Sequence, residues 1–414
     1  MHKSLKDFEK VIHECVKCGV CQAHCPTYLV SRREGAVARG KIALAAALLD
    51  GEIGLEERLQ QDISMCLMCG SCVNSCPNKV PTHEIVGAIR REITGNQGLS
   101  LIGKGVSALL GSKVLMKTLT KSGALLSPLL FEKIPETSGL QLRFPVFAMK
   151  GRTIPKIAFR NLFDRTPEFI QGLPDKPVIG FFAGCAITYV YPEIGEAMIR
   201  VLQRMGYSVF LPKGQQCCGI PALSAGNGRL VEELAPANVE AFRKRDVQYI
   251  ITACASCNGG LGAYRSMEAD FGDFTDKVID FSVFLQKEGL FAELAGMEKQ
   301  QDRVRVTYHD PCHLKTQGIT GEPRELLQAL PNVDFIEMEN ASACCGLGGT
   351  FSVYHYECSK AIGERKIPGL KESGACVIAT ACPGCIMQLQ DSINHAGLQV
   401  KAVHILDLLA EALR

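Results

Sequence analysis

Two runs of four cysteines near the start of the chain have the residue type and spacing that iron–sulfur clusters require. Each run reads Cys-x2-Cys-x2-Cys-x3-Cys-Pro, over residues 15–26 and again over residues 66–77. Three thiolates separated by two residues can bind three irons of one [4Fe–4S] cubane, and the turn at the proline carries the fourth cysteine away. The runs therefore predict two cubane clusters and one-electron transfer.

Exchange of the fourth cysteine between the runs is typical of two-cluster domains and predicts two ligand sets. The first set is Cys15, Cys18, Cys21 and Cys76, and the second is Cys66, Cys69, Cys72 and Cys25. A disulfide framework is disfavoured because the chain is long and has no secretory signal at Met1. Zinc sites use pairs of Cys-x2-Cys rather than an unbroken run of four.

Two short helices are predicted between the cysteine runs. Residues 42–49 are rich in Ala and Leu, and residues 52–63 form a second helical stretch that ends just before Cys66. Helices that join two cluster loops indicate an α-helical ferredoxin domain, which we expect over residues 1–95.

Length and composition limit the possible classes of protein. The 414 residues predict two to three domains, and a hydrophobic content of 47% allows sizeable cores. A net charge of +2 does not suggest a nucleic-acid partner, and no apolar run is long enough to predict a membrane span. Twenty cysteines in a chain without an export signal should be metal ligands or reduced thiols, which predicts a cytoplasmic location.

Ten further cysteines occur in two copies of one pattern. In both copies 31 residues separate a lone cysteine from a Cys-Cys-Gly motif, and 35 or 36 more residues lead to a Cys-x2-Cys pair. The first copy contains Cys185, Cys217, Cys218, Cys254 and Cys257; the second contains Cys312, Cys344, Cys345, Cys382 and Cys385. Such self-similarity predicts a duplicated module, over residues 176–295 and 300–414.

Each copy is predicted to be a small α/β unit with a parallel sheet. Short apolar strands precede the lone cysteines and the Cys-x2-Cys pairs, at residues 178–182, 304–309, 249–252 and 376–380. Helices at residues 196–205 and 323–329 lie between them and are followed by strands at 208–211 and 334–338. Ligands gather at the carboxyl ends of such strands, so the five thiols of each copy should converge at one edge.

The five-cysteine sets favour a multi-iron centre. Four thiolates would complete a zinc site, so five exceed what one zinc needs, although zinc and buried structural cysteines remain alternatives. Gly219 and Gly346 fit a loop that requires a positive φ close to a cluster. Cys376 is expected in the apolar core, and Cys358 is given no role.

Several motifs resemble one known family, the iron–sulfur subunits of glycolate and lactate oxidases, which are related to the catalytic subunit of heterodisulfide reductase through their cysteine-rich CCG modules. The motifs are Cys15–Pro26 with its Cys-Pro-Thr-Tyr end, His309–Leu314, Glu322–Leu327 and Cys344–Gly349. The resemblance covers nearly the whole chain except residues 95–175.

This resemblance implies an electron-transfer subunit of a 2-hydroxy-acid dehydrogenase. A partner FAD-linked oxidase subunit would oxidise glycolate or lactate, and the electrons would pass through the two [4Fe–4S] clusters to a quinone or a soluble carrier. The alternative is a heterodisulfide-reductase-like enzyme, whose modules hold one or two noncubane [4Fe–4S] clusters that reduce a disulfide. No Gly-x-Gly-x-x-Gly follows a strand, so the chain is not expected to bind a dinucleotide itself, and no catalytic residue is predicted.

Residues 96–175 are predicted to be a linker with one or two amphipathic helices within residues 101–130. These helices either cover the ferredoxin domain or dock to the flavoprotein or to the inner face of the cytoplasmic membrane. Residues 143–155 are expected to be extended. His309 and Asp310 either orient the thiolate of Cys312 or a bound ligand, or cap the turn after the strand.

Overall fold

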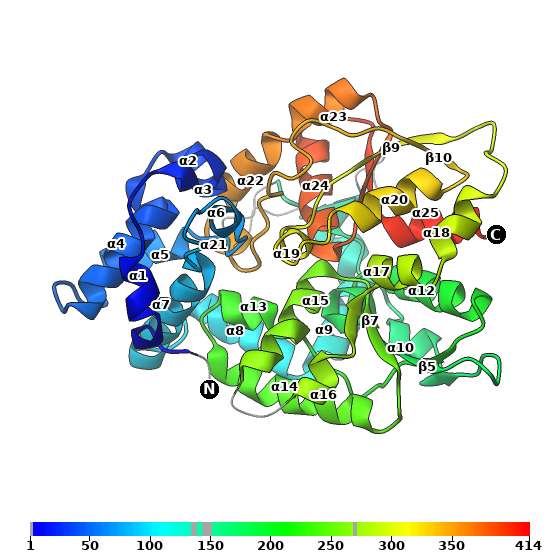
Figure 1. The fold of residues 1–414 in the computed structure, drawn as a ribbon, viewed down its shortest axis with the longest axis horizontal. Coiled ribbons are helices and arrows are strands. Elements are labelled where there is room, and N and C mark those ends of the chain that lie inside the picture. Colours follow the sequence, from blue (N-terminus) through cyan, green and yellow to red (C-terminus); the bar gives the residue numbers. More distant parts are fainter. Residues whose placement is uncertain (1–2, 134–138, 143–150, 268–270) are drawn as a thin grey trace.

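The computed structural model describes residues 3–133, 139–142, 151–267 and 271–414. An all-helical N-terminal domain lies at one end of the molecule, and two α/β modules lie side by side at the other (Figure 1). This is the predicted fold class. Within these described ranges no helix combines the length and the apolar character needed to cross a bilayer.

The N-terminal domain consists of short helices around a small apolar core. The helices are α1 (Glu9–His13), α2 (Val20–His24), α3 (Pro26–Ser31), α4 (Ala38–Leu49), α5 (Glu57–Ser64), α6 (Ser71–Asn74) and α7 (Thr82–Gln97), with 3-10 turns at Lys6–Phe8 and Glu34–Ala36. Ile12, Ala45 and Ile89 are among the buried core residues. The helix predicted from residue 52 begins only at Glu57, since residues 51–56 form a turn after α4 in which Gly51 takes a left-handed φ of 72°.

The first module has a five-stranded sheet in the order β4-β6-β5-β7-β8, in which only the edge strand β4 is antiparallel. Its strands are β4 (Phe169–Ile170), β5 (Val178–Phe182), β6 (Ser208–Phe210), β7 (Tyr249–Thr252) and β8 (Val278–Asp280). Its helices are α10 (Leu162–Arg165), α11 (Gly184–Tyr189), α12 (Pro192–Arg204), α13 (Ile220–Ser224), α14 (Gly228–Arg243), α15 (Ala255–Gly262), α16 (Gly272–Thr275), α17 (Phe281–Lys287) and α18 (Leu290–Ala295), with a 3-10 turn at Ala263–Ser266.

The second module repeats this plan with a four-stranded parallel sheet in the order β10-β9-β11-β12. Its strands are β9 (Val304–Tyr308), β10 (Val333–Phe335), β11 (Val377–Thr380) and β12 (Lys401–His404). Its helices are α19 (Cys312–Lys315), α20 (Gly321–Ala329), α21 (Phe351–Tyr354), α22 (Tyr356–Glu364), α23 (Ile367–Ser373), α24 (Pro383–His395) and α25 (Ile405–Ala412). The central strands of both modules match the predicted positions to within one residue at each end.

The two modules pack against each other through matching pairs of helices. Helix α12 packs on α25, and its counterpart α20 packs on α17; likewise α15 packs on α19, and α11 on α24. One continuous core of buried residues extends from Leu162 to Ala412. In each module the helices that follow the cysteine-bearing loops form the contact with the other module, so the sheet edges that carry the cysteines face each other.

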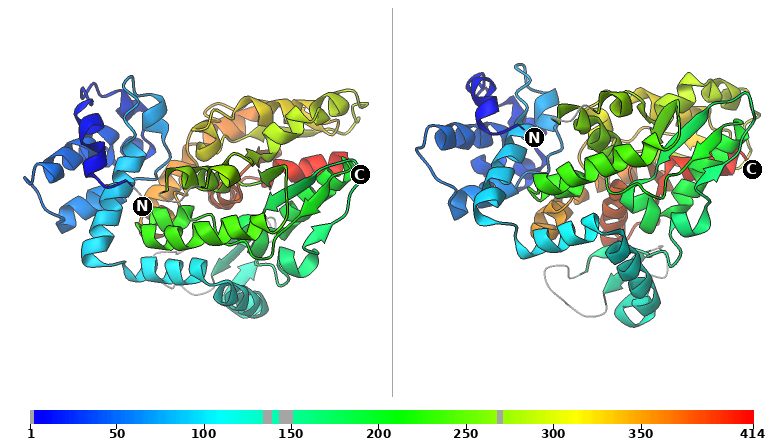
Figure 2. Two further views of the ribbon diagram at one scale, coloured as in Figure 1. Left: turned by 60° about the horizontal axis from the view of Figure 1, so that its bottom comes forward. Right: turned by 90° about the horizontal axis from the view of Figure 1, so that it is seen from below.

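The middle segment differs from its prediction. Helices α8 (Leu101–Gly111) and α9 (Lys113–Leu130) form as expected, but they pack on the first module, against α13, α14 and α11, rather than covering the N-terminal domain. Figure 2 shows α8 and α9 along the side of the first module. Apolar residues of α8 explain this contact, since Leu110 packs on the core of the first module.

A small antiparallel sheet follows α9. Its strands are β1 (Phe131–Lys133), β2 (Gly139–Leu142) and β3 (Thr153–Pro155), in the order β1-β2-β3. Residues 143–150 of the predicted extended linker lie outside the described residues, and its end is extended as strand β3, which packs on α24.

Candidate iron–sulfur sites

The first cysteine site of the N-terminal domain forms where the first cysteine run meets the end of the second run. One cavity is lined by Cys15, Cys18, Cys21 and Cys76, the four predicted ligands of the first cluster, and also by Cys72, which lines the second cavity as well. The loop around it is tightly wound, since Lys17 and Gly19 have φ of 54° and 85°. The fold thus brings the fourth cysteine of the second run to the first three of the first run.

The second site has the reciprocal composition. Its cavity is lined by Cys25, Cys66, Cys69 and Cys72, the predicted ligands of the second cluster. Met68 and Gly70 repeat the left-handed conformations of the first loop, with φ of 57° and 69°. Four thiols around one small cavity are the donor set of a [4Fe–4S] cluster, so the residues fit the predicted cofactor.

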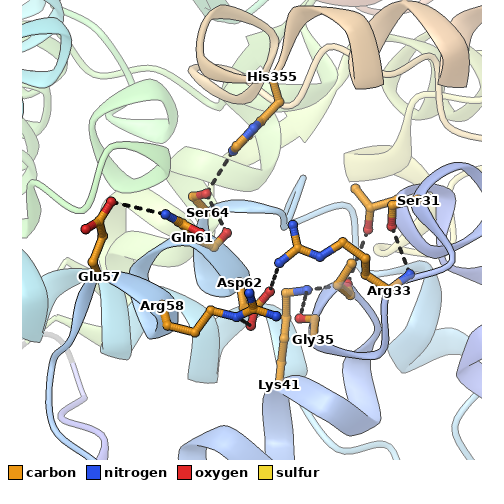
Figure 3. Close-up of polar contacts among 12 residues, drawn as sticks. Ser31, Arg33, Gly35, Lys41, Glu57, Arg58, Gln61, Asp62, Ser64 and His355 are labelled. Carbon is orange, nitrogen blue, oxygen red and sulfur yellow. Dashed lines mark hydrogen bonds and ion pairs between the residues drawn. The ribbon is translucent and has the colours of Figure 1, made fainter.

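A buried lysine lies beside this second site. Figure 3 shows Lys41, which donates hydrogen bonds to the backbone carbonyls of Gly35 at 3.1 Å and Ala36. Burial lowers the pKa of Lys41, while the nearby thiols of Cys66 and Cys25 act in the opposite direction. The adjoining Asp62 is paired with Arg33 at 2.6 Å. The second cavity therefore has a fixed cationic neighbour, which no spacing in the sequence indicated.

The five thiols of the first module converge where β5 and β7 end. The Sγ atoms of Cys185 and Cys217 are 3.9 Å apart, and Cys218 interacts with Cys257. A Cβ atom at Gly184 would lie 2.5 Å from the Sγ of Cys257, so a side chain there would displace the thiol. The predicted positive φ of Gly219 is confirmed, at 94°.

The second module repeats this geometry. The Sγ atoms of Cys345 and Cys385 are 3.6 Å apart, and Gly346 has a φ of 99°. In both modules the amide of the glycine donates to the first thiol of the Cys-Cys pair, from Gly346 to Cys344 and from Gly219 to Cys217, at 3.4 Å each. The predicted convergence of five thiols at one sheet edge is therefore present in both copies.

Hydrogen bonding favours the thiolate at equivalent positions of the two modules. Bonds from the neighbouring thiols, first from Cys217 and then from Cys257, lower the pKa of Cys218 well below its ordinary value. Bonds from Cys344 and Cys385 likewise lower the pKa of Cys345. The thiolate is the form that binds metal, and the second thiol of each Cys-Cys pair favours it, while the pKa of the first thiol is raised by its hydrogen bond to the second. Soft sulfur donors in this number fit iron–sulfur centres in both modules.

The four sites follow one another in a line: Cys72 lines both N-terminal cavities, and two contacts between thiols join the second of these sites to the modules. Cys69 of the N-terminal domain is hydrogen-bonded to Cys344 of the second module. Cys382 of the second module is hydrogen-bonded to Cys254 of the first. Apolar side chains surround the first of these junctions, where Leu67 and Phe351 belong to the same buried cluster as Cys69. The order along the line is first N-terminal site, second N-terminal site, second module, first module.

The two cysteines outside the patterns lie elsewhere. Cys376 is exposed at the residue before β11, so the prediction that it belongs to the core is wrong. The apolar run predicted its burial, but its position precedes the strand and faces solvent. Cys358 is half-buried in α22.

Comparison with known proteins identifies the class of protein that this fold and these sites define. A family model described as "4Fe-4S dicluster domain" matches residues 11–80, and one described as "Cysteine-rich domain" matches residues 179–262 and 306–390. The chain is an oxidoreductase subunit whose cofactors are [4Fe–4S] clusters.

Similar proteins narrow the class further. The chain is 31% identical to the "Probable glycolate oxidase iron-sulfur subunit" of Bacillus subtilis (strain 168), over 96% of this chain and 93% of that protein. It therefore belongs to the family of glycolate oxidase iron–sulfur subunits. It is 27% identical to one subunit of the dihydromethanophenazine:CoB–CoM heterodisulfide reductase of Methanosarcina barkeri (strain Fusaro / DSM 804), over 96% and 93% of the two chains. It is 30% identical to "Lactate utilization protein A" of Geobacillus sp. (strain WCH70), over 56% of this chain and 98% of that protein.

Proposed function

We propose that this chain transfers electrons within a 2-hydroxy-acid dehydrogenase complex. A partner FAD-linked oxidase subunit removes two electrons and two protons from glycolate or lactate and releases the 2-oxo acid. The chain accepts the electrons one at a time and delivers them to a quinone or a soluble carrier. The names of the glycolate oxidase and lactate utilization relatives support the substrate class.

The ligands proposed for the two cubane clusters follow the crossed pattern. Cys15, Cys18, Cys21 and Cys76 hold one cluster, and Cys66, Cys69, Cys72 and Cys25 hold the other. The lining of the two cavities supports this assignment. The five cysteines of each module hold a further iron–sulfur centre in the same proposal: Cys185, Cys217, Cys218, Cys254 and Cys257 in the first, and Cys312, Cys344, Cys345, Cys382 and Cys385 in the second.

One observation carries the proposal: the thiols of neighbouring sites touch. Cys72 lines both N-terminal cavities, Cys69 is hydrogen-bonded to Cys344, and Cys382 is hydrogen-bonded to Cys254, so each cysteine site adjoins the next. Electron transfer requires such short gaps between centres, whereas a chain that only offered interaction surface would not need its metal sites in line.

We propose the exposed face of α8 and α9 as the contact with the flavoprotein. Leu101, Val114 and Leu125 are 86%, 77% and 72% exposed on these helices. Lys117 and Lys121 are paired with Asp164, at 2.7 Å and 3.7 Å, so their charge is partly neutralised. That pairing favours a protein partner over an anionic lipid surface, and any attachment to the inner face of the cytoplasmic membrane would come through the partner.

The test uses the complex of this chain with its FAD-linked subunit. With glycolate or lactate as the substrate, the flavin and then the clusters should become reduced. In Cys69→Ser the substrate should still reduce the flavin, but electrons should fail to reach an external acceptor. The matched control is Cys376→Ser, which changes an exposed cysteine and should leave this transfer unchanged. Reduction of the flavin without any reduction of the clusters in the wild-type complex would rule out the proposed transfer.

A second candidate is reduction of a disulfide at the two modules. The contact between Cys254 and Cys382 favours it, because it brings two complete five-cysteine sites together across the module interface. Heterodisulfide reductase relatives also cover nearly the whole chain. Efficient disulfide reduction by the purified chain with a chemical reductant, and without any flavoprotein, would favour this candidate over the first.

A further inference from the structure

The two modules differ at one position next to their cysteine sites. His309 stands three residues before Cys312, and Phe182 stands three residues before Cys185. The strand register makes the same match: Phe182 pairs with Thr252, two residues before Cys254, and Tyr308 pairs with Ala379, which places the next residue, His309, level with Thr380, two residues before Cys382. A histidine of the second module thus replaces a phenylalanine of the first.

His309 points into the cysteine site of the second module. Its side chain is only 1% exposed, and one ring nitrogen lies within 4.8 Å of the Sγ atoms of both Cys345 and Cys385. Among the described residues neither ring nitrogen has a hydrogen-bond partner. The predicted alternative, in which His309 caps the turn after the strand, is therefore not what its side chain does.

The groups around His309 are already engaged elsewhere. Asp310 accepts two hydrogen bonds from Arg324, at 2.7 Å and 2.8 Å. Lys366 donates to the backbone carbonyls of Asn340, Ala341 and Ala343. A buried imidazole N–H without an acceptor is unfavourable, so the acceptor has to come from the site itself. The sulfurs of Cys345 and Cys385 lie within 4.8 Å of one ring nitrogen, so a small shift of the ring would bring one of them to hydrogen-bond distance.

We propose that His309 is a positioning residue that donates a hydrogen bond from its ring N–H to a cysteine sulfur of the second module's iron–sulfur centre. The inference rests on the proposed occupancy of that module. Hydrogen bonds to cluster sulfurs stabilise the more negative, reduced form, so this centre becomes easier to reduce than the centre of the first module. An electron that arrives from Cys69 would then be held at the second module before it moves on.

The experiment compares the full-length holoprotein with His309→Phe and His309→Gln. His309→Phe introduces the phenylalanine that the first module has at the equivalent position. His309→Gln keeps an N–H donor, but on a side chain of different length. In protein labelled with 15N-histidine, pulsed EPR should detect a weak histidine nitrogen coupling to one reduced centre. One histidine coupling should disappear in His309→Phe, together with a shift of one midpoint potential to a lower value, while the iron content stays unchanged; the coupling of His313, whose Nδ1 lies 3.8 Å from the Sγ of Cys312, should remain. His309→Gln should shift the potential less.

A matched control is His395→Gln, which changes a histidine bonded to Tyr356 rather than to a cysteine and should leave every potential in place. Unchanged potentials and spectra in His309→Phe would overturn the inference, and so would the strong coupling of a nitrogen bound directly to iron. About eight irons in the wild-type protein would account for the two cubanes alone and would overturn the proposed occupancy as well. More than eight irons with an unaffected His309→Phe variant would overturn only the role of His309.

Discussion

Lys41 places a buried positive charge beside the second N-terminal site. The ammonium group stabilises a cluster more when the cluster has gained an electron, so Lys41→Met should lower the potential of that cluster. A lost interaction of about 1.4 kcal/mol corresponds to a shift of about 60 mV for one electron. Redox titration followed by EPR measures the shift, and Lys10→Met, at an exposed position of α1, is the control that should leave the potential unchanged.

Asp280 makes the stability of the first module depend on pH. Burial raises the pKa of Asp280 to about 6 from an ordinary 3.8, and one of its carboxylate oxygens has no hydrogen-bond partner among the described residues. The unfolded chain loses this proton at lower pH than the folded chain does. The charged carboxylate therefore destabilises the fold fully above about pH 6, and this cost disappears as the pH falls towards 3.8.

Asp280→Asn should accordingly raise the melting temperature at pH 8, with a gain in the free energy of unfolding of at most about 3 kcal/mol. The amide oxygen of the new side chain can still accept from the backbone amide of Ser282, as the Oδ1 of Asp280 does at 2.9 Å. The gain should shrink when the melting curves are repeated at pH 5. An equal gain at both pH values would show that the charge of Asp280 is not its cause.

At the scale of single elements, the loops after the Cys-Cys pairs depend on glycine. A Cβ atom on Gly346 would lie 2.5 Å from the backbone oxygen of Ser359, whereas on Gly219 it would meet only the side chain of Val231 at 3.0 Å. Gly346→Ala should cost about 1–3 kcal/mol through backbone strain and reduce the iron bound by the second module. Gly219→Ala should have a smaller effect, because a side chain moves more easily than backbone.

The control for these loops is Gly262→Ala. Gly262 ends α15 with a helical φ of −59°, and its added Cβ would meet no described atom within 4 Å. This substitution should be neutral or slightly stabilising, since alanine is the better helix former. Iron analysis and thermal melts of the three variants test the comparison; equal iron loss in all three would contradict a specific role for the left-handed glycine.

The same elements show what could be predicted from the sequence. Apolar strands such as Tyr249–Thr252 and the repeated cysteine spacing predicted the parallel sheets and the convergence of the thiols, because both depend on local pattern. The packing of α8 on the first module could not be predicted, because it depends on contacts between segments that are distant in the sequence. The position of Lys41 beside the second site could not be predicted either, because the cysteine spacing does not encode the tertiary fold that buries it. The sequence motif singles out His309, but only its orientation towards Cys345 distinguishes a cluster contact from a cap.

At the scale of the whole molecule, Arg90 joins the N-terminal domain to the modules. Its guanidinium donates to the carbonyls of Ile63 at 3.0 Å and Cys66 at 2.7 Å, and across the interface to the carbonyl of Ser224 at 2.9 Å. The neighbouring contact between Ser64 and His355 crosses to the second module at 2.8 Å (Figure 3). The junction between Cys69 and Cys344 lies in this same interface, so its geometry depends on these polar contacts.

Arg90→Met removes the hydrogen bonds but keeps much of the apolar volume of the side chain. The four carbonyls that accept from Arg90, those of Ile63, Ser64, Cys66 and Ser224, lose their shared donor, so the interface should loosen and electrons should pass from the N-terminal clusters to the modules several-fold more slowly. Iron content should stay as in the wild type, since the cysteines themselves are untouched, whereas the potential of the second N-terminal cluster should fall, because the positive charge of Arg90 lies beside Cys66. Rapid-mixing measurements of cluster reduction provide the rate, and Arg243→Met, which removes only an exposed pair with Asp273, should leave it unchanged. A normal rate in Arg90→Met would mean that apolar packing around Leu67 and Phe351 alone holds the junction.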